Sequence, residues 1–140
     1  PAEPPTTTAP PPTTAATPVP APPPATHTVA ASIALGYLGV PYKWGGASRV
    51  EGFDCSGLVM TVFAQLGVQL PHSSQAQYGF GVPVAKDQLQ PGDLVFFDAL
   101  DHVGIYIGGG EIVHAPHTGD VVRIASLASF GTRYVGARRI

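Results

Sequence analysis

Cys55 is the only cysteine among the 140 residues, and it stands where a loop is expected to become a helix. Asp54 is a good helix N-cap, and a mostly apolar run follows over residues 58–66. A thiol at a helix N-terminus meets the positive end of the helix dipole, which favours the nucleophilic thiolate. His102 and His114, further along the chain, could supply a base. These residue types point to a cysteine nucleophile assisted by imidazole.

The register of a predicted hairpin decides whether the two histidines share a face. If residues 102–107 and 111–116 pair through a three-residue loop, Gly104 lies opposite His114, and His102 becomes a diagonal neighbour of His114. A two-residue turn would place His114 among core side chains, because a shift of one residue moves every side chain to the other face. The apolar pattern favours the three-residue loop. The other face then collects Val103, Ile105, Ile107, Val113 and Ala115.

We therefore expect Cys55 to be the nucleophile, His102 the general base and His114 the group that orients His102. A helix N-terminus and an imidazolium can lower a thiol pKa to about 3.5–7.5. The backbone N–H of Cys55 and the hydroxyl of Tyr42 are candidates for an oxyanion hole. The hypothesis depends on the helix start, the shared face of the histidines and the glycine-rich loop before the cysteine.

Other interpretations of these residues stay open. Cys55 could be a small buried residue and the two histidines ordinary surface residues of strands. A zinc site is less favoured, because paired ligands at short spacing do not occur, and no metal or other cofactor is expected. Trp44 is interpreted as a core aromatic residue. Three histidines are interpreted as solvated loop residues, namely His27, His72 and His117.

The segments that must position these residues indicate an α+β fold. Apolar spacing predicts a helix over 30–38, a second over 55–66 and a short third over 73–78. Five β-rich runs follow, and helices before an antiparallel meander are typical of α+β domains. These runs cover 94–98, 102–108, 111–115, 121–125 and 134–138. We expect the cysteine helix to pack its apolar stripe on one face of the central antiparallel sheet.

Composition divides the chain into two parts. Residues 1–28 hold 11 of the 16 prolines and little besides Pro, Thr and Ala, which predicts a disordered, extended linker. Residues 29–140 are predicted to form one catalytic domain. The net charge of −2 argues against a nucleic-acid binder, and no apolar stretch approaches the ~18–20 residues of a membrane span. Three arginines are interpreted as a solvated edge, namely Arg133, Arg138 and Arg139.

Six segments together resemble the NlpC/P60 family of cell-wall cysteine peptidases. They are Tyr-Leu-Gly-Val-Pro-Tyr-Lys-Trp-Gly-Gly (37–46), Phe-Asp-Cys-Ser-Gly-Leu-Val (53–59), Gln-Pro-Gly-Asp-Leu-Val-Phe-Phe (90–97), His-Val-Gly-Ile-Tyr-Ile-Gly (102–108), Ile-Val-His-Ala-Pro (112–116) and Tyr-Val-Gly-Ala-Arg-Arg-Ile (134–140). The resemblance covers essentially all of 29–140. It implies a compact papain-like α+β domain, with a triad at Cys55, His102 and His114 and the active-site tyrosine at Tyr42.

The resemblance also implies a substrate. Members of the family hydrolyse peptidoglycan stem peptides, typically between D-γ-glutamyl and a diamino acid such as meso-diaminopimelate. Asp54 and Ser56 match positions beside the nucleophile that help to hold the substrate, and Ser73 is a further candidate for substrate binding. The chain departs from the family at His72, where many members carry arginine, so the substrate contacts of this loop are open.

These implications describe a secreted, monomeric cysteine endopeptidase of the bacterial cell wall that binds peptidoglycan stem peptides. It has no nucleic-acid partner and no membrane span. Because the sequence begins with Pro1, we expect a trimmed fragment whose signal peptide lies outside it. Two alternatives remain for the same domain. It could be a non-catalytic peptidoglycan-binding module, or an acyl or peptidyl transferase that uses the same cysteine.

Overall fold

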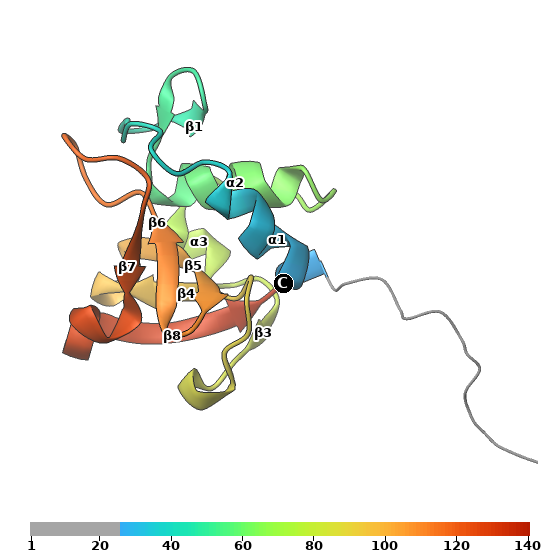
Figure 1. Ribbon diagram of the computed structural model, residues 1–140. Coiled ribbons are helices and arrows are strands. Elements are labelled where there is room, and N and C mark those ends of the chain that lie inside the picture. Colours follow the sequence, from blue (N-terminus) through green and yellow to red (C-terminus); the bar gives the residue numbers. More distant parts are fainter. Residues whose placement is uncertain (1–25) are drawn as a thin grey trace, which may run out of the picture.

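The computed structural model describes residues 26–140, in which helices lie over a six-stranded sheet (Figure 1). The helices are α1 (Thr26–Leu35), α2 (Cys55–Ala64) and α3 (Ser74–Gln77). The sheet runs in the order β3-β8-β4-β5-β6-β7, and each neighbouring pair is antiparallel. Its strands are β3 (Val82–Pro83), β4 (Leu94–Phe97), β5 (His102–Gly108), β6 (Glu111–His114), β7 (Arg123–Ser126) and β8 (Tyr134–Arg139). The predicted α+β fold is confirmed.

Short elements connect this frame. Strands β1 (Ala47–Ser48) and β2 (Gly52–Phe53) form a separate antiparallel pair, ahead of α2 in the chain. Three 3₁₀ segments cover Lys86–Gln88, Asp98–Leu100 and Leu127–Arg133. The sequence did not predict β1, β2 or β3, since a strand of two residues has no hydrophobic period to detect.

Several predicted boundaries shift in the structure. Helix α1 begins at Thr26, inside the segment predicted as linker, and residues 1–25 of that segment lie outside the described residues. Helix α2 starts at Cys55 as predicted but ends at Ala64 rather than at residue 66. The predicted meander is wrong in one connection, because β8 pairs with β4 and β3 instead of extending the sheet beyond β7. The last strand therefore lies inside the sheet, where both of its edges are paired.

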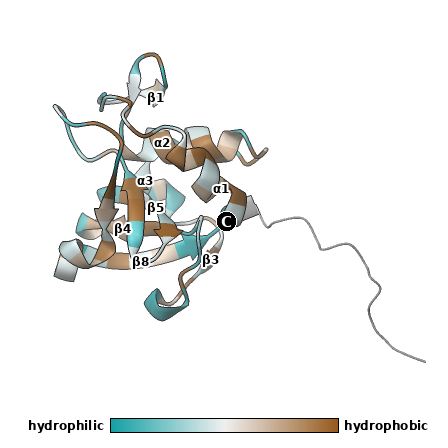
Figure 2. Ribbon diagram, viewed as in Figure 1, coloured by the Kyte–Doolittle hydropathy of each residue, from teal (hydrophilic) through white to brown (hydrophobic). Residues whose placement is uncertain are grey.

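The cysteine helix is fixed to the sheet by its apolar stripe. Leu58, Val59, Val62 and Phe63 are fully buried. They share a core with side chains of β4 and β5, among them Phe96 and Val103. In Figure 2 hydrophobic colour runs along α1, α2 and the strands beneath them, whereas the turn after β3 is hydrophilic. Burial of this stripe sets the position of the first residue of α2, which is Cys55.

The β5–β6 hairpin adopts the predicted register by a different turn. Ile105 pairs with Val113, and continuing that register puts Gly104 opposite His114. The turn itself is Gly109-Gly110, closed by the Gly108–Glu111 pair, and a bulge between residues 106 and 108 restores the register that a two-residue turn would lose. The predicted apolar face is confirmed. Val103, Ile105, Val113 and Ala115 are fully buried, and Ile107 packs against them.

Arg133 is exposed, as predicted for a solvated edge, but Arg138 and Arg139 are half-buried, so the interpretation is wrong for these two. Arg139 donates through Nε and an Nη2 nitrogen to the two carboxylate oxygens of Asp93, at 2.8 Å each, and Asp93 is fully buried. Arg133 makes a similar two-point contact with Asp98, at 2.7 and 2.8 Å. Arg138 lies over the ring of Tyr78, 4.6 Å from its centre. Sequence position alone gave no sign of these partners, which are 35 and more residues away along the chain.

The hairpin register predicts the effect of Gly104→Ala. A Cβ at residue 104 would lie 2.9 Å from Cδ1 of Ile112 and 3.3 Å from Cβ of His114. We expect this overpacking to lower the free energy of unfolding by about 1–3 kcal/mol, as measured by chemical denaturation. Gly79→Ala is the matched control, since its Cβ would meet only the carbonyl oxygen of Ala76 at 3.4 Å. Equal stability of the two variants would contradict the register.

Candidate active site

Cys55 is the first residue of α2, and the Asp54 carboxylate fixes that helix start. Oδ1 of Asp54 accepts the backbone N–H of Gly57 at 2.7 Å, and Oδ2 accepts that of Gly45 at 3.0 Å. Gly57 must be glycine here, because a Cβ at this position would lie 1.9 Å from the carbonyl oxygen of Gly46. Asp54 therefore performs the capping role that the sequence predicted, and it also ties the glycine-rich loop to the cysteine.

His102 and His114 meet on one face of the sheet, as the hairpin register predicts. His102 is the first residue of β5 and His114 the last residue of β6. Nε2 of His102 and Nδ1 of His114 are 2.8 Å apart, which is a hydrogen bond between the two rings. This contact occupies Nε2 of His102 and leaves its Nδ1 for a different partner. His114 is thus placed to orient the ring of His102.

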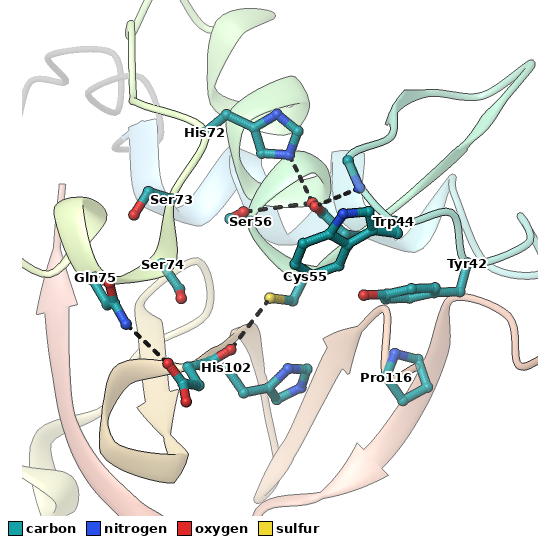
Figure 3. Close-up of a pocket in the computed structure, with 13 residues that line it drawn as sticks. Tyr42, Trp44, Cys55, Ser56, His72, Ser73, Ser74, Gln75, His102 and Pro116 are labelled. Carbon is teal, nitrogen blue, oxygen red and sulfur yellow. Dashed lines mark hydrogen bonds and ion pairs between the residues drawn. The ribbon is translucent and has the colours of Figure 1, made fainter. Parts of the chain in front are cut away.

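A cleft with a volume of about 680 Å³ gathers most of the predicted site residues. Cys55, His102 and Tyr42 line it, and in Figure 3 the thiol, the imidazole and the phenol hydroxyl face into the same space. Asp54, Ser56 and Ser73 line it as well. His114 lies behind His102, on a smaller cavity of about 270 Å³. The structure therefore brings all seven predicted site residues to this cleft or directly behind it.

The predicted residues at the cleft wall have local structural roles too. Ser73 is the N-cap of α3, where its Oγ accepts the backbone N–H of Ala76 at 3.2 Å. Ser56 is buried, and its Oγ lies 3.5 Å from Oδ1 of Asp54. The Cys55 thiol donates to the carbonyl oxygen of Asp101 at 3.9 Å. Hydrogen bonds of catalytic groups often tighten only when substrate binds.

Burial makes the two histidines unusually weak bases. The ring of Phe130 stacks on that of His102 at 6.3 Å and meets that of His114 edge-on at 5.7 Å. The ring of Phe97 is 6.0 Å from that of His102. Desolvation in these surroundings lowers the pKa of both His102 and His114 to about 4. His102 is consequently a neutral imidazole at physiological pH, which is the form that can accept a proton.

The cysteine differs from the sequence-based expectation. Burial raises the pKa of Cys55, and the nearby charge of Asp54 acts in the same direction. Backbone N–H groups, chiefly that of Val103, oppose this effect. Desolvation therefore outweighs the helix N-terminus, and the cleft holds a thiol beside a neutral imidazole. A nucleophilic attack by this sulfur would require that the thiol proton pass to a neighbouring base.

A left-handed turn immediately precedes His102, and the sequence did not predict it. Asp98, Ala99 and Leu100 have φ angles of 55°, 54° and 76°, a conformation that non-glycine residues rarely adopt. The Arg133 contacts hold Asp98, and Oγ of Ser74 donates to the carbonyl oxygen of Leu100 at 2.6 Å. Such strain persists only where the surroundings fix it. The turn directs Asp101 and His102 toward the cysteine.

Two assignments from the sequence are wrong, namely Trp44 as a core residue and His27 as a solvated loop residue. Trp44 is not a core residue, since 82% of it is exposed and it lines the cleft. His72 lies in an exposed loop, as predicted, but its Nε2 is 2.7 Å from Oδ1 of Asp54 and it lines the cleft too. His27 belongs to α1 and contacts Gln90 at 3.3 Å. His117 is exposed, 3.7 Å from Asp120.

The described residues also bear on metals and membranes. Within residues 26–140, no cluster of three or more His, Cys, Asp or Glu side chains is arranged to hold a metal ion. In the same part of the chain, no helix combines the length and apolar character needed to cross a membrane.

The fold and the cleft define the class of the protein. A cysteine at the start of a helix, packed against an antiparallel sheet that carries a histidine pair, is the arrangement of a papain-like α+β domain. Residues 39–139 match the NlpC/P60 family. The chain therefore belongs to the NlpC/P60 family.

Relatives in several bacteria support this assignment. A probable endopeptidase of Mycobacterium tuberculosis is 51% identical over 113 residues, which cover 80% of this chain and 29% of that protein. The murein DD-endopeptidase MepH of Escherichia coli is 38% identical, covering 80% of this chain and 45% of MepH. The gamma-DL-glutamyl hydrolase of Bacillus subtilis is 41% identical, covering 74% and 27%. The chain thus spans less than half the length of these relatives.

Solved structures show the same domain. An NlpC/P60 family protein from Bacillus cereus superposes with a TM-score of 0.76 and 39% sequence identity, over 84% of this chain and 41% of that one. The NlpC/P60 domain of the peptidoglycan hydrolase SagA superposes with a TM-score of 0.74 and 32% identity, over 81% of this chain and 98% of that domain. The predicted papain-like NlpC/P60 fold is confirmed.

The raised pKa of Cys55 predicts a neutral thiol at pH 7 in the substrate-free protein. Because Cys55 is the only cysteine, the ultraviolet absorbance of its thiolate can be followed as a difference between the protein and its Cys55→Ser variant. We expect thiolate to form only above the ordinary thiol range, about pH 8.5, and alkylation by iodoacetamide to follow the same curve. Full thiolate absorbance at pH 6 would contradict the proposed resting state.

Proposed function

We propose that the domain is a cysteine endopeptidase that hydrolyses the stem peptides of peptidoglycan at the D-γ-glutamyl–meso-diaminopimelate bond. One observation carries the proposal, namely the cleft that presents the Cys55 thiol together with the His102 imidazole and the Tyr42 hydroxyl. Family membership and relatives named as endopeptidases support it. A protein that cuts this polymer acts outside the cytoplasm, so we propose the cell wall as its place of action.

The proposed chemistry follows from the geometry. As Sγ of Cys55 attacks the γ-glutamyl carbonyl, Nδ1 of His102 takes the thiol proton, because Nε2 is already bonded to His114. The backbone N–H of Cys55 and the Tyr42 hydroxyl stabilise the oxyanion. His102 then protonates the leaving amine and the C–N bond breaks, which leaves a thioester. Water, deprotonated by His102, hydrolyses the thioester and frees the thiol.

Tyr42 fits the oxyanion role because it stays protonated. Burial raises the pKa of its hydroxyl, and Asp54 and Cys55 raise it further. A hydroxyl that holds its proton can donate a hydrogen bond to the oxyanion at neutral pH, where His102 is also neutral. His114 would act as a positioning residue, since it contacts His102 and does not line the cleft.

The names of the relatives leave the scissile bond to be tested. MepH is named a DD-endopeptidase, whereas the Bacillus subtilis relative is named a gamma-DL-glutamyl hydrolase. We favour the γ-glutamyl bond because it joins a D to an L centre, as the second name describes. Digestion of defined muropeptides, followed by mass spectrometry, separates the two, since each bond gives different product masses. Transfer to an added amine would give a third product and would indicate the transferase alternative.

Cys55→Ala removes the nucleophile, so we expect no muropeptide cleavage above background and unchanged binding of the same muropeptide. The assay is product formation by mass spectrometry, with binding measured by calorimetry. The non-catalytic binding module predicts that the unaltered protein, too, binds the muropeptide without cleaving it. Turnover that survives in the Cys55→Ala variant would exclude the proposed mechanism.

Tyr42→Phe deletes one donor of the oxyanion hole and keeps the ring. Loss of such a donor lowers kcat by about 10²- to 10³-fold, and we expect kcat to fall within this range while KM stays within a few-fold. The measurement is steady-state hydrolysis of a muropeptide. Tyr106→Phe is the matched control, because the Tyr106 hydroxyl only accepts the N–H of Gly110 on the β5–β6 turn. An equal effect of both changes would remove Tyr42 from the oxyanion hole.

A further inference from the structure

The proposed reaction places a positive charge on His102. When Nδ1 of His102 takes the thiol proton, the ring becomes an imidazolium packed against Phe97 and Phe130. In a triad that ends in a carboxylate, that carboxylate stabilises the imidazolium. His114 stands in this place here, and it is a neutral ring because burial lowers its own pKa to about 4. A stabilising negative charge therefore has to come from outside the three predicted catalytic residues.

The cavity of about 270 Å³ behind the histidine pair is lined by charged groups. Two ion pairs lie on its walls, Asp98–Arg133 at 2.7 Å and Asp120–Arg123 at 3.1 Å. His117 lines the cavity as well. On the cleft side, the titratable groups around His102 are Tyr42, Asp54, Cys55, His72 and Asp101. Asp98 and Asp120 are thus the carboxylates that face the histidine pair from behind.

Asp98 is the carboxylate that acts on His102. It follows Phe97, which pairs with His102 across the β4–β5 hairpin, and its carbonyl oxygen accepts a backbone N–H of the turn at 3.0 Å. Asp98 and His102 line the same cavity. The charge of Asp98 raises the pKa of His102, whereas the charge of Asp120 raises that of His114. Position in the hairpin and electrostatic effect therefore single out the same carboxylate.

Arg133 fixes the direction of the Asp98 carboxylate. Its Nε and Nη2 donate to the two carboxylate oxygens at 2.7 and 2.8 Å. Its guanidinium lies 5.0 Å from the centre of the Phe130 ring, which stacks on His102. Arg133 lowers the pKa of His102, but the opposite effect of Asp98 is larger. The ion pair thus presents its negative end to the imidazole.

We propose that Asp98 is a positioning residue that stabilises the imidazolium form of His102, with Arg133 holding its carboxylate toward the ring. The proposal rests on the proposed function, because it concerns the proton that His102 takes from Cys55. Negative charge behind the ring favours the protonated form during the attack, while the apolar surroundings keep the ring neutral beforehand. Asp98 performs the electrostatic part of a triad carboxylate and leaves the hydrogen bond to His114.

Two variants break the Asp98–Arg133 contact in opposite electrostatic senses. Asp98→Asn keeps the shape of the side chain and leaves the guanidinium unopposed, so we expect the pKa of His102 to fall below its value of about 4. Arg133→Gln leaves the carboxylate unopposed, so we expect that pKa to rise. The ring ¹⁵N chemical shifts of His102, followed against pH by NMR, measure both changes.

A contact that only holds the turn in place predicts a different result. Loosening the turn would admit water to the His102 ring, so both variants would then raise its pKa. A rise in Asp98→Asn, or no change, overturns the proposal. Asp87→Asn is the matched control, because it removes the same charge from the exposed Lys86–Gln88 turn, and it should leave the titration of His102 unchanged.

A third variant decides the question even if Asp98→Asn folds poorly. Arg133→Lys keeps the positive charge but loses the two-point contact with Asp98. We therefore expect the pKa of His102 to stay lower in Arg133→Lys than in Arg133→Gln. Equal values in these two variants would show that the contact, and not its charge, matters, and would overturn the proposal.

Turnover gives a second readout. Asp98 is not among the described residues that line the cleft, so Asp98→Asn should leave the KM for a muropeptide unchanged. We expect its kcat to fall by about twofold to fivefold, because 34% of the Asp98 side chain is exposed and solvent screens the interaction. The acidic limb of kcat/KM, which requires neutral His102, should move to lower pH. An unchanged kcat, or a rise in KM alone, overturns the proposal.

The outcome is separable from the proposed function. The NMR titration needs no turnover, so it reports on Asp98 whether or not muropeptides are cleaved. If muropeptides are cleaved while Asp98→Asn raises the pKa of His102, the function stands and the role of Asp98 is wrong. If the unaltered protein cleaves no muropeptide, the function fails, and opposite shifts in Asp98→Asn and Arg133→Gln still support the electrostatic coupling of Asp98 to His102.

Discussion

The hydrogen bonds of the Asp54 carboxylate hold the parts of the candidate active site in place. Its two oxygens accept N–H groups from Gly57 in the first turn of α2 and from Gly45 in the preceding loop, and one of them also meets His72. One side chain thereby joins the cysteine helix, the glycine-rich loop and the loop before α3. Because a helix N-terminus leaves its first N–H groups unpaired, the carboxylate that satisfies them also defines where the helix starts and where the thiol lies.

The other half of the site depends on desolvation. The histidine pair is packed against Phe97 and Phe130, and the apolar surroundings keep both rings neutral. The same burial raises the pKa of the thiol. The cleft therefore holds an uncharged thiol and an uncharged imidazole, which avoids two unscreened charges in a partly dry site. Charge separation would occur only with substrate bound, when the oxyanion donors stabilise the negative charge that forms on the carbonyl oxygen.

His72 lies on the wall of an acidic cleft, which its position in a loop does not suggest. With Asp54 and Asp101 on the walls and no described lysine or arginine among the lining residues, an anionic peptide meets a negative surface. The imidazole of His72 contacts one carboxylate oxygen of Asp54 at 2.7 Å, while the other oxygen accepts the N–H of Gly45. The departure at residue 72 thus lies on the cleft wall, outside the set of Cys55, His102 and His114.

The sequence by itself determined the fold class, the helix start at Cys55 and the shared face of His102 and His114, because helical capping, hydrophobic period and strand parity are local rules. It could also carry the family assignment, because six short segments match in order. Only the tertiary structure decided the place of β8 inside the sheet, the contact of His72 with Asp54, the exposure of Trp44 and the neutral state of the thiol. Each of these depends on which distant residues meet and exclude water, and no local pattern encodes that. The Arg133–Asp98 contact, which steadies the left-handed turn before His102, joins residues 35 positions apart for the same reason.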